Sequence, residues 1–193
     1  MKSVIISIKP KDCELIANGK MTIKVLKNRP KIETPFKCYI YCIYGQGLIE
    51  ANDEILPNHL LEQKVSRYKT WGNCCNGKVI GEFVCDRIYE IKNLGSSFMI
   101  DNNIALTNLI ARESCLEFPD LRAYLKDKNG CAWHISDLKL YYKPKELSEF
   151  KRWNRTEENS PCAHTKWLYP DCKDCKECNL TRPPKSWCYV EEA

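Results

Sequence analysis

The segment NGKMTIKVLKNRPK, residues 18–31, combines the end of a helix, an alternating strand and a concentration of positive charge. Asn18-Gly19 is a typical helix end, and residues 21–27 alternate as a β-strand does. The segment predicts a basic binding strand, a strand that carries catalytic residues, or a solvated surface strand. Its five basic side chains are Lys20, Lys24, Lys27, Arg29 and Lys31.

The residues on either side of this segment predict a chain in which strands dominate and short helices connect them. Pro10 suits the first turn of a helix over residues 10–19, and Gly81 marks a bend or bulge in a strand. We therefore predict an α+β fold, a small mixed β-barrel with short helices in its connections. The predicted strands are 3–8, 21–27, 36–45, 78–91, 131–142 and 186–190, and the predicted helices are 10–19, 105–115, 118–128 and 143–153.

The composition is that of a globular protein. The chain has 193 residues, of which 44% are hydrophobic and 28% charged, enough to bury a core. No apolar run approaches the roughly 18–20 residues that span a bilayer, and the first residues lack the features of a signal peptide. We therefore expect a cytoplasmic protein without a membrane partner.

The positive charge is concentrated at one end of the sequence. Residues 1–31 hold eight Lys and Arg against two acidic residues, a balance of +6, whereas the whole chain carries +5. The remaining residues therefore sum to −1. A local basic segment is typical of a surface that binds phosphates, although a solvated lysine-rich surface has the same composition.

Several separate segments together resemble the ASCH family of PUA-like domains, in particular the bacterial and phage type with a cysteine-rich extension. These are the strand after Gly19, GKVIGEF at 77–83, WHISDL at 133–138 and RPPKSWCYV at 182–190. The resemblance covers roughly residues 1–150 in the order of elements. It implies a twisted β-barrel that binds RNA or modified nucleosides, which some members hydrolyse.

The chain departs from this family at the strand that carries its polar residues. At the named positions of the family pattern Gly-x-Lys-x-x-Glu-x-Arg, this chain has Gly19, Met21, Lys24 and Leu26. The resemblance implies that the lysine is the nucleophile or base in amidohydrolases of the family. The methionine at its position here has no proton to transfer. We therefore predict an RNA- or nucleotide-binding module without amidohydrolase activity.

Eight residues are candidates for binding the ligand. Lysine and arginine would contact phosphates, Trp133 would either stack on a base or belong to the core, and His134 would position the ligand. A catalytic triad of His134, Ser136 and Asp137 is excluded because Asp137 would lie on the opposite strand face. The candidates are Lys20, Thr22, Lys24, Lys27, Arg29, Lys31, Trp133 and His134.

Two functions of other classes stay open at this point. One is a hydrolase of nucleic acids or modified nucleosides, either a ribonuclease or an N4-acylcytidine amidohydrolase-like enzyme, in which Lys20 or Lys24 acts with Glu82 as an acid or base. The other is a phage or host protein-interaction factor that contacts a partner protein through its C-terminal residues.

The C-terminal residues are rich in potential metal ligands. The spacing Cys172-x2-Cys175 is that of two thiolates on one tetrahedral zinc, and a structural zinc would stabilise a segment with few aliphatic residues. An iron–sulfur cluster and reduced cysteines are the alternatives. We predict an ASCH-like domain at 1–150 and a zinc-binding extension at 151–193 whose last strand, 186–190, returns to the barrel. The candidate ligands are Cys162, His164, Cys172, Cys175, Cys178 and Cys188.

Overall fold

The computed structural model describes residues 2–44, 76–95, 97–103, 106–153 and 179–192. They form a six-stranded sheet in the order β8-β4-β3-β1-β10-β9 and a four-stranded sheet in the order β2-β7-β5-β6. The strands are β1 (Ser3–Ile8), β2 (Ile23–Leu26), β3 (Phe36–Cys42), β4 (Lys78–Cys85), β5 (Ile88–Asn93), β6 (Phe98–Ile100), β7 (Gly130–His134), β8 (Ser136–Lys145), β9 (Phe150–Arg152) and β10 (Trp187–Glu192). The helices are α1 (Pro10–Ala17), α4 (Leu106–Glu113), α5 (Phe118–Leu125) and the 3-10 helix η1 (Leu147–Glu149).

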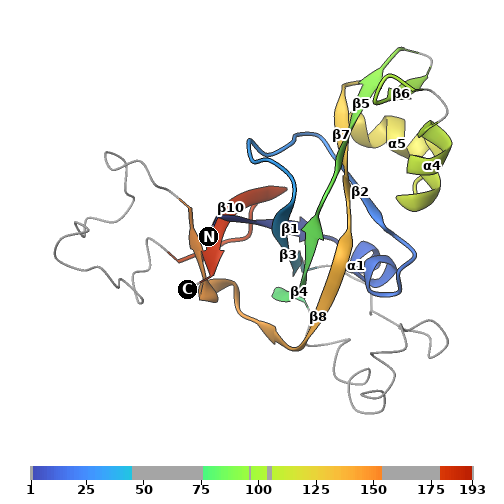
Figure 1. Ribbon diagram of the computed structural model, residues 1–193. Helices are drawn as coiled ribbons and strands as arrows, with labels where there is room; N and C mark the ends of the chain where they lie inside the picture. Colours follow the sequence, from blue (N-terminus) through green and yellow to red (C-terminus); the bar gives the residue numbers. More distant parts are fainter. Residues whose placement is uncertain (1, 45–75, 96, 104–105, 154–178, 193) are drawn as a thin grey trace.

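Strand β1 lies inside the six-stranded sheet, which explains its largely apolar sequence. It pairs in parallel with β3, where Val4 lies opposite Cys38, and antiparallel with β10, where Val4 lies opposite Tyr189. Val4, Ile5 and Ile6 have no exposed surface. The last strand of the chain therefore lies directly beside the first (Figure 1).

Two strands that the sequence predicted as continuous are each broken where the chain passes between the sheets. Residues 78–91 form β4 and most of β5, and residues 131–142 lie in β7 and β8. β4 pairs with β8 in the larger sheet, whereas β5 pairs with β7 in the smaller one. At the crossing, the His134 amide donates to the Arg87 carbonyl at 2.9 Å. Periodicity does not reveal such a break, because each half keeps the pattern of a strand.

The irregularity predicted at Gly81 is confirmed. The register between β4 and β8 shifts between Val79 and Gly81. A Cβ atom added to Gly81 would lie 2.5 Å from the carbonyl oxygen of Lys139, so the neighbouring strand approaches too closely for a side chain.

Helix α1 forms as the sequence predicts. Pro10 occupies its first turn, and Gly19 follows its end with φ of +67°, a conformation that glycine adopts without strain. Cys13 and Ile16 on its buried side join the main core together with Met21. The helix therefore places the start of β2 against the larger sheet.

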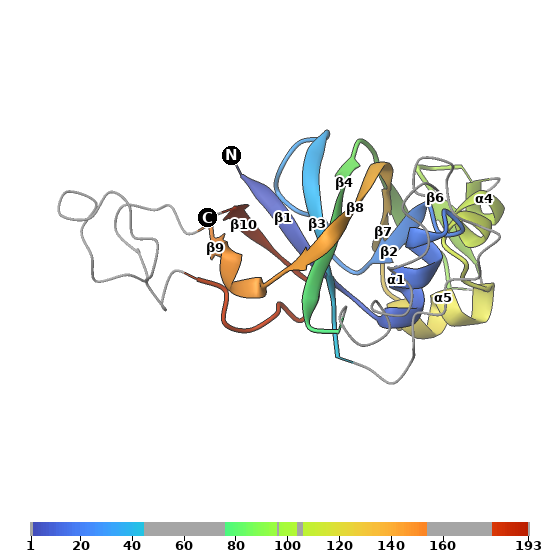
Figure 2. The ribbon, with the colours of Figure 1, turned by 90° about the horizontal axis from the view of Figure 1, so that it is seen from below.

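The helices α4 and α5 cover the smaller sheet at the end of the molecule opposite β9 (Figure 2). Ile110 of α4 and Leu121 and Leu125 of α5 are buried there, in a second core that also contains Ile23 and Val25 of β2. Strand β2 therefore contributes to two cores, the one under these helices and the main one between the sheets.

The predicted α+β class is confirmed, but the described residues form two sheets rather than a closed barrel. The division at residues 150 and 151 stays a prediction, because residues 154–178 lie outside the described part. In the described residues, no helix is long and apolar enough to cross a membrane.

Candidate functional site

Two residues of the segment 18–31 contribute apolar side chains to the core. Met21 and Leu26 are each 3% exposed and pack in the main core. Their positions are those at which the ASCH pattern has a lysine and an arginine. These two positions therefore serve packing in this chain, and neither presents a polar group to a ligand.

Lys24 is half-buried and already paired. Its Nζ lies 2.6 Å from Oδ2 of Asp12, and the two side chains are 16% and 26% exposed. Asp12 belongs to the first turn of α1, so the pair connects the helix to β2. A phosphate that approached Lys24 would compete with this carboxylate, and the residue is less available for binding than the sequence suggested.

The other four basic residues of the segment are exposed. Lys20 precedes β2, and Lys27, Arg29 and Lys31 follow it. Nζ of Lys27 lies 5.2 Å from the centre of the Tyr124 ring. The guanidinium of Arg29 is 3.8 Å from the Glu90 carboxylate, but both side chains are more than half exposed, and such pairs are weak in water. We call residues 27–31 the basic loop.

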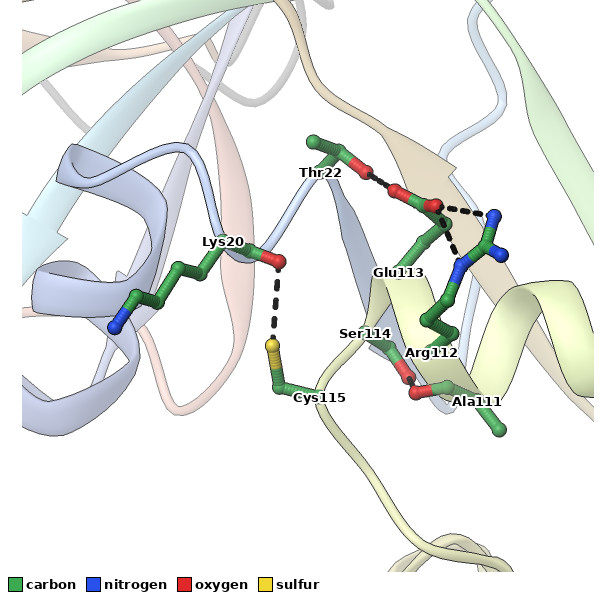
Figure 3. A network of polar contacts seen from close by, with 7 residues as sticks. All are labelled: Lys20, Thr22, Ala111, Arg112, Glu113, Ser114 and Cys115. Atoms are coloured by element: carbon green, nitrogen blue, oxygen red, sulfur yellow. Dashed lines mark hydrogen bonds and ion pairs between the residues drawn. The ribbon is translucent and has the colours of Figure 1, made fainter. Parts of the chain in front are cut away.

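A hydrogen-bonded network joins the beginning of β2 to the end of α4 (Figure 3). The Thr22 hydroxyl donates to Oε2 of Glu113, and the Thr22 amide donates to the Glu113 carbonyl at 3.0 Å. The guanidinium of Arg112 contacts Oε1 of Glu113 at 3.0 Å. The hydrogen bond from Thr22, followed by that from Arg112, lowers the pKa of Glu113. Glu113 is therefore held as a carboxylate beside Thr22.

Lys20 contacts the same turn through its backbone. The Cys115 thiol donates to the Lys20 carbonyl at 3.3 Å, while the Lys20 side chain points away from Thr22 and Glu113 (Figure 3). Its ammonium is therefore directed to a different part of the surface.

His134 has a carboxylate partner that the sequence did not indicate. Its Nδ1 lies 2.7 Å from Oδ1 of Asp86, at the break between β4 and β5. Burial opposes the ionisation of Asp86, but the hydrogen bond and charge of His134 outweigh it and lower the pKa of this carboxyl. His134 lies opposite Ile23, and its charge also lowers the pKa of Glu113. We call Thr22, Glu113, His134 and Asp86 the polar cluster.

Comparison with solved structures shows what fold carries this arrangement. An ASCH protein from Zymomonas mobilis matches with a TM-score of 0.53 and 15% identity, over 98% of this chain and 87% of the other. Two single-residue variants of that protein, tyrosine to phenylalanine and serine to alanine, match with TM-scores of 0.53 and 14% identity. They cover 99% and 98% of this chain and 91% and 88% of theirs. The chain has an ASCH-domain fold.

Comparisons of the sequence found no match. No protein-family model matches the sequence, and no curated protein matches it. At 15% identity, the structural match shows the fold alone.

Of the two alternatives for Trp133, the structure shows packing in the core rather than a ring exposed for stacking on a base. Trp133 has no exposed surface, and its ring contacts Phe36 at 5.5 Å and Trp187 at 5.9 Å between centroids. Its indole nitrogen donates to Sγ of Cys131. A base would have to displace this core to reach the ring.

The structure does not bring together the catalytic group predicted from Lys20, Lys24 and Glu82. The Glu82 side chain, 14% exposed, accepts a hydrogen bond from the Tyr141 hydroxyl at 2.7 Å and pairs with Lys37 at 3.2 Å. These contacts belong to the larger sheet, whereas Lys24 lies in β2 of the smaller sheet and pairs with α1.

Of the six candidate metal ligands, Cys188 alone lies in the described part of the chain. It lies on β10 and packs against a hydrophobic core, and burial raises the pKa of its thiol to about 11. No group of three potential metal ligands occurs among the described residues. The five other candidates, Cys162, His164, Cys172, Cys175 and Cys178, lie outside the described residues.

The contact between Asp86 and His134 makes stability depend on pH. A carboxyl whose pKa is lower in the folded state stabilises that state above the unfolded pKa, and this contribution disappears as the pH falls through the folded value. At neutral pH, we expect Asp86→Asn to be less stable than the wild type by less than about 1 kcal/mol, since the pair is exposed. The difference should vanish below the ordinary pKa of 3.8, as the carboxyl protonates.

Urea denaturation across this pH range measures the difference. Asp137→Asn is the matched control, because it removes an exposed carboxylate from the neighbouring strand β8. Identical pH profiles for the wild type and Asp86→Asn would contradict the role assigned to the contact.

Proposed function

We propose that the protein is an RNA- or nucleotide-binding module whose main contacts come from the basic loop. The observation that carries this proposal is the exposure of Lys27, Arg29 and Lys31 at alternate positions after an edge strand. In the described part of the chain, the one carboxylate within ion-pair distance of these three residues is that of Glu90. Their charge is therefore available to phosphates, and such contacts bind with strong dependence on salt.

The polar cluster supplies groups that suit a base or ribose next to those phosphates. The Thr22 hydroxyl can accept a hydrogen bond while it donates to Glu113. The His134 ring uses Nδ1 for Asp86, which leaves Nε2 for another partner. Hydrogen bonds to the edges of exposed bases are the usual source of specificity for single-stranded RNA. We assign affinity to the basic loop and selectivity to the polar cluster.

The residues on β2 and just before it support ligand binding without the family's amidohydrolase chemistry. The position of the family's lysine is filled by Met21, which is buried, and that of its arginine by Leu26. Lys24 replaces the family's acidic residue and pairs with Asp12. A buried methionine and a paired lysine support packing and helix placement rather than proton transfer.

One observation favours hydrolysis as a second candidate function. His134, oriented by Asp86, lies near Thr22 and Glu113, and a histidine held by a carboxylate is suited to general acid–base catalysis. This group differs from the set of Lys20, Lys24 and Glu82 that the sequence suggested. The substrate would be RNA or a modified nucleoside.

Replacing two residues of the basic loop tests the binding proposal. For Lys27→Gln combined with Arg29→Gln, we expect weaker binding of a single-stranded RNA oligonucleotide. The slope of log K against log salt should become shallower by about 1.4, because each phosphate contact contributes about 0.7. Fluorescence anisotropy at a series of salt concentrations measures both quantities.

The matched control is Lys139→Gln combined with Lys143→Gln, which removes two exposed charges from β8. Equal weakening by both double variants, or no binding by the wild type at low salt, would refute the binding proposal. If the wild type shortens the RNA during the assay and His134→Gln does not, hydrolysis is the function.

We further propose that the C-terminal cysteines bind a structural zinc. The support is the spacing of Cys172 and Cys175, with Cys162, His164 and Cys178 as further ligands. Cys188 is left out of this set because it lies on β10 opposite Ile5 of β1 and packs against a hydrophobic core.

Elemental analysis of the purified chain tests this proposal. We expect about one zinc per chain, lost when Cys172 and Cys175 are both replaced by Ser, because two of four tetrahedral ligands are then absent. Cys188→Ser is the control and should retain the metal. Iron together with a brown colour would show a cluster instead, and a metal-free wild type would refute both.

A further inference from the structure

We propose that Tyr189, Lys2 and Lys31 form a second phosphate-binding site, on the last strand of the chain. This inference rests on the proposed binding of RNA and extends it to a surface outside β2 and the polar cluster. The ligand chemistry is a phosphate group, which either the RNA backbone or free phosphate supplies.

The Tyr189 hydroxyl is held in an orientation that suits an anion. The backbone amide of Lys31 donates to its oxygen at 2.5 Å. Because this contact uses the oxygen as an acceptor, the hydroxyl proton remains available to another acceptor. A phosphate oxygen is such an acceptor, and a hydrogen bond to a charged oxygen is stronger than one between neutral groups.

Two lysines from distant parts of the sequence lie beside Tyr189. Nζ of Lys2 lies 3.8 Å from the centre of the Tyr189 ring. The Lys31 side chain is exposed, and the amide of the same residue contacts the hydroxyl. Neither ammonium is within 4.0 Å of a carboxylate in the described part of the chain. The site therefore has two positive charges that no described acidic residue balances.

Trp187 fixes the geometry of the site. Its ring contacts that of Tyr189 at 5.3 Å with an interplanar angle of 70°, and it also packs against the buried Trp133. Its indole nitrogen donates to the carbonyl of Asn28 at 3.1 Å. The basic loop and β10 are thus joined at both Asn28 and Lys31, so the donor groups are positioned before a ligand arrives, which lowers the entropy cost of binding.

The position of the site relates it to the proposed RNA surface. The basic loop leads from the end of β2 to Tyr189, so the exposed charges of Lys27 and Arg29 lie between the polar cluster and this site along the chain. A single-stranded RNA that follows the loop would present successive phosphates to these groups. A base near the polar cluster and a phosphate at Tyr189 could then be bound by one oligonucleotide.

Two conservative variants test the site. Tyr189→Phe keeps the ring beside Lys2 and Trp187 but removes the hydroxyl, and we expect about tenfold weaker binding of single-stranded RNA. Lys2→Gln leaves Tyr189 unchanged and should reduce the salt slope by about 0.7. Lys139→Gln, at the opposite edge of the six-stranded sheet, is the control, and circular dichroism verifies that each variant is folded.

A second measurement separates this inference from the binding proposal. Inorganic phosphate is added to each variant while the amide resonance of Lys31 is followed by NMR. If the wild type binds RNA and Tyr189→Phe binds as tightly as Lys139→Gln, the site is refuted while RNA binding stands. If RNA does not bind but phosphate shifts the Lys31 resonance in the wild type and not in Tyr189→Phe, the site is supported with free phosphate as its ligand. Absence of both effects refutes both proposals.

Discussion

The burial of β1 between β3 and β10 is the constraint on which the rest of the structure depends. Val4, Ile5, Ile6 and Ile8 are at most 1% exposed, and each such side chain contributes roughly 1.5–3 kcal/mol when buried. Strand pairing with β10 brings Tyr189 opposite Val4, next to Lys2. The last strand thereby supports the basic loop, although nearly the whole sequence separates it from β1. The candidate surface is consequently a product of the first and last strands together.

Strand β2 shows how packing and charge are divided within one short segment. Met21 and Leu26 serve the main core, Ile23 and Val25 serve the core under α4 and α5, and Lys24 pairs with α1. Positive charge stays exposed just outside the strand, where residues 27–31 have left both cores. An element that is used for packing on both faces has little freedom to present reactive groups, so the loop is the part of this segment suited to a ligand.

The sequence predicted the elements whose signals are local. The apolar run of β1 and the Pro10-to-Gly19 helix could be identified because neighbouring residues alone determine them. The strand breaks at Arg87 and Ile135 could not be predicted, since they depend on the pairing of two strands that are distant in sequence. The same holds for the contacts of the polar cluster, where Asp86 and His134 are 48 residues apart and Thr22 and Glu113 are 91 apart.

Charge itself was predictable, but its availability was not. Lys24 and Lys31 belong to the same basic segment, yet Lys24 pairs with Asp12 whereas Lys31 contacts Tyr189 through its backbone and leaves its ammonium exposed. Alternation predicts the face on which a side chain lies, and it carries no information about which helix or strand covers that face. In the described part of this chain, the cations without a structural partner are therefore better evidence for a binding surface than the number of basic residues in the sequence.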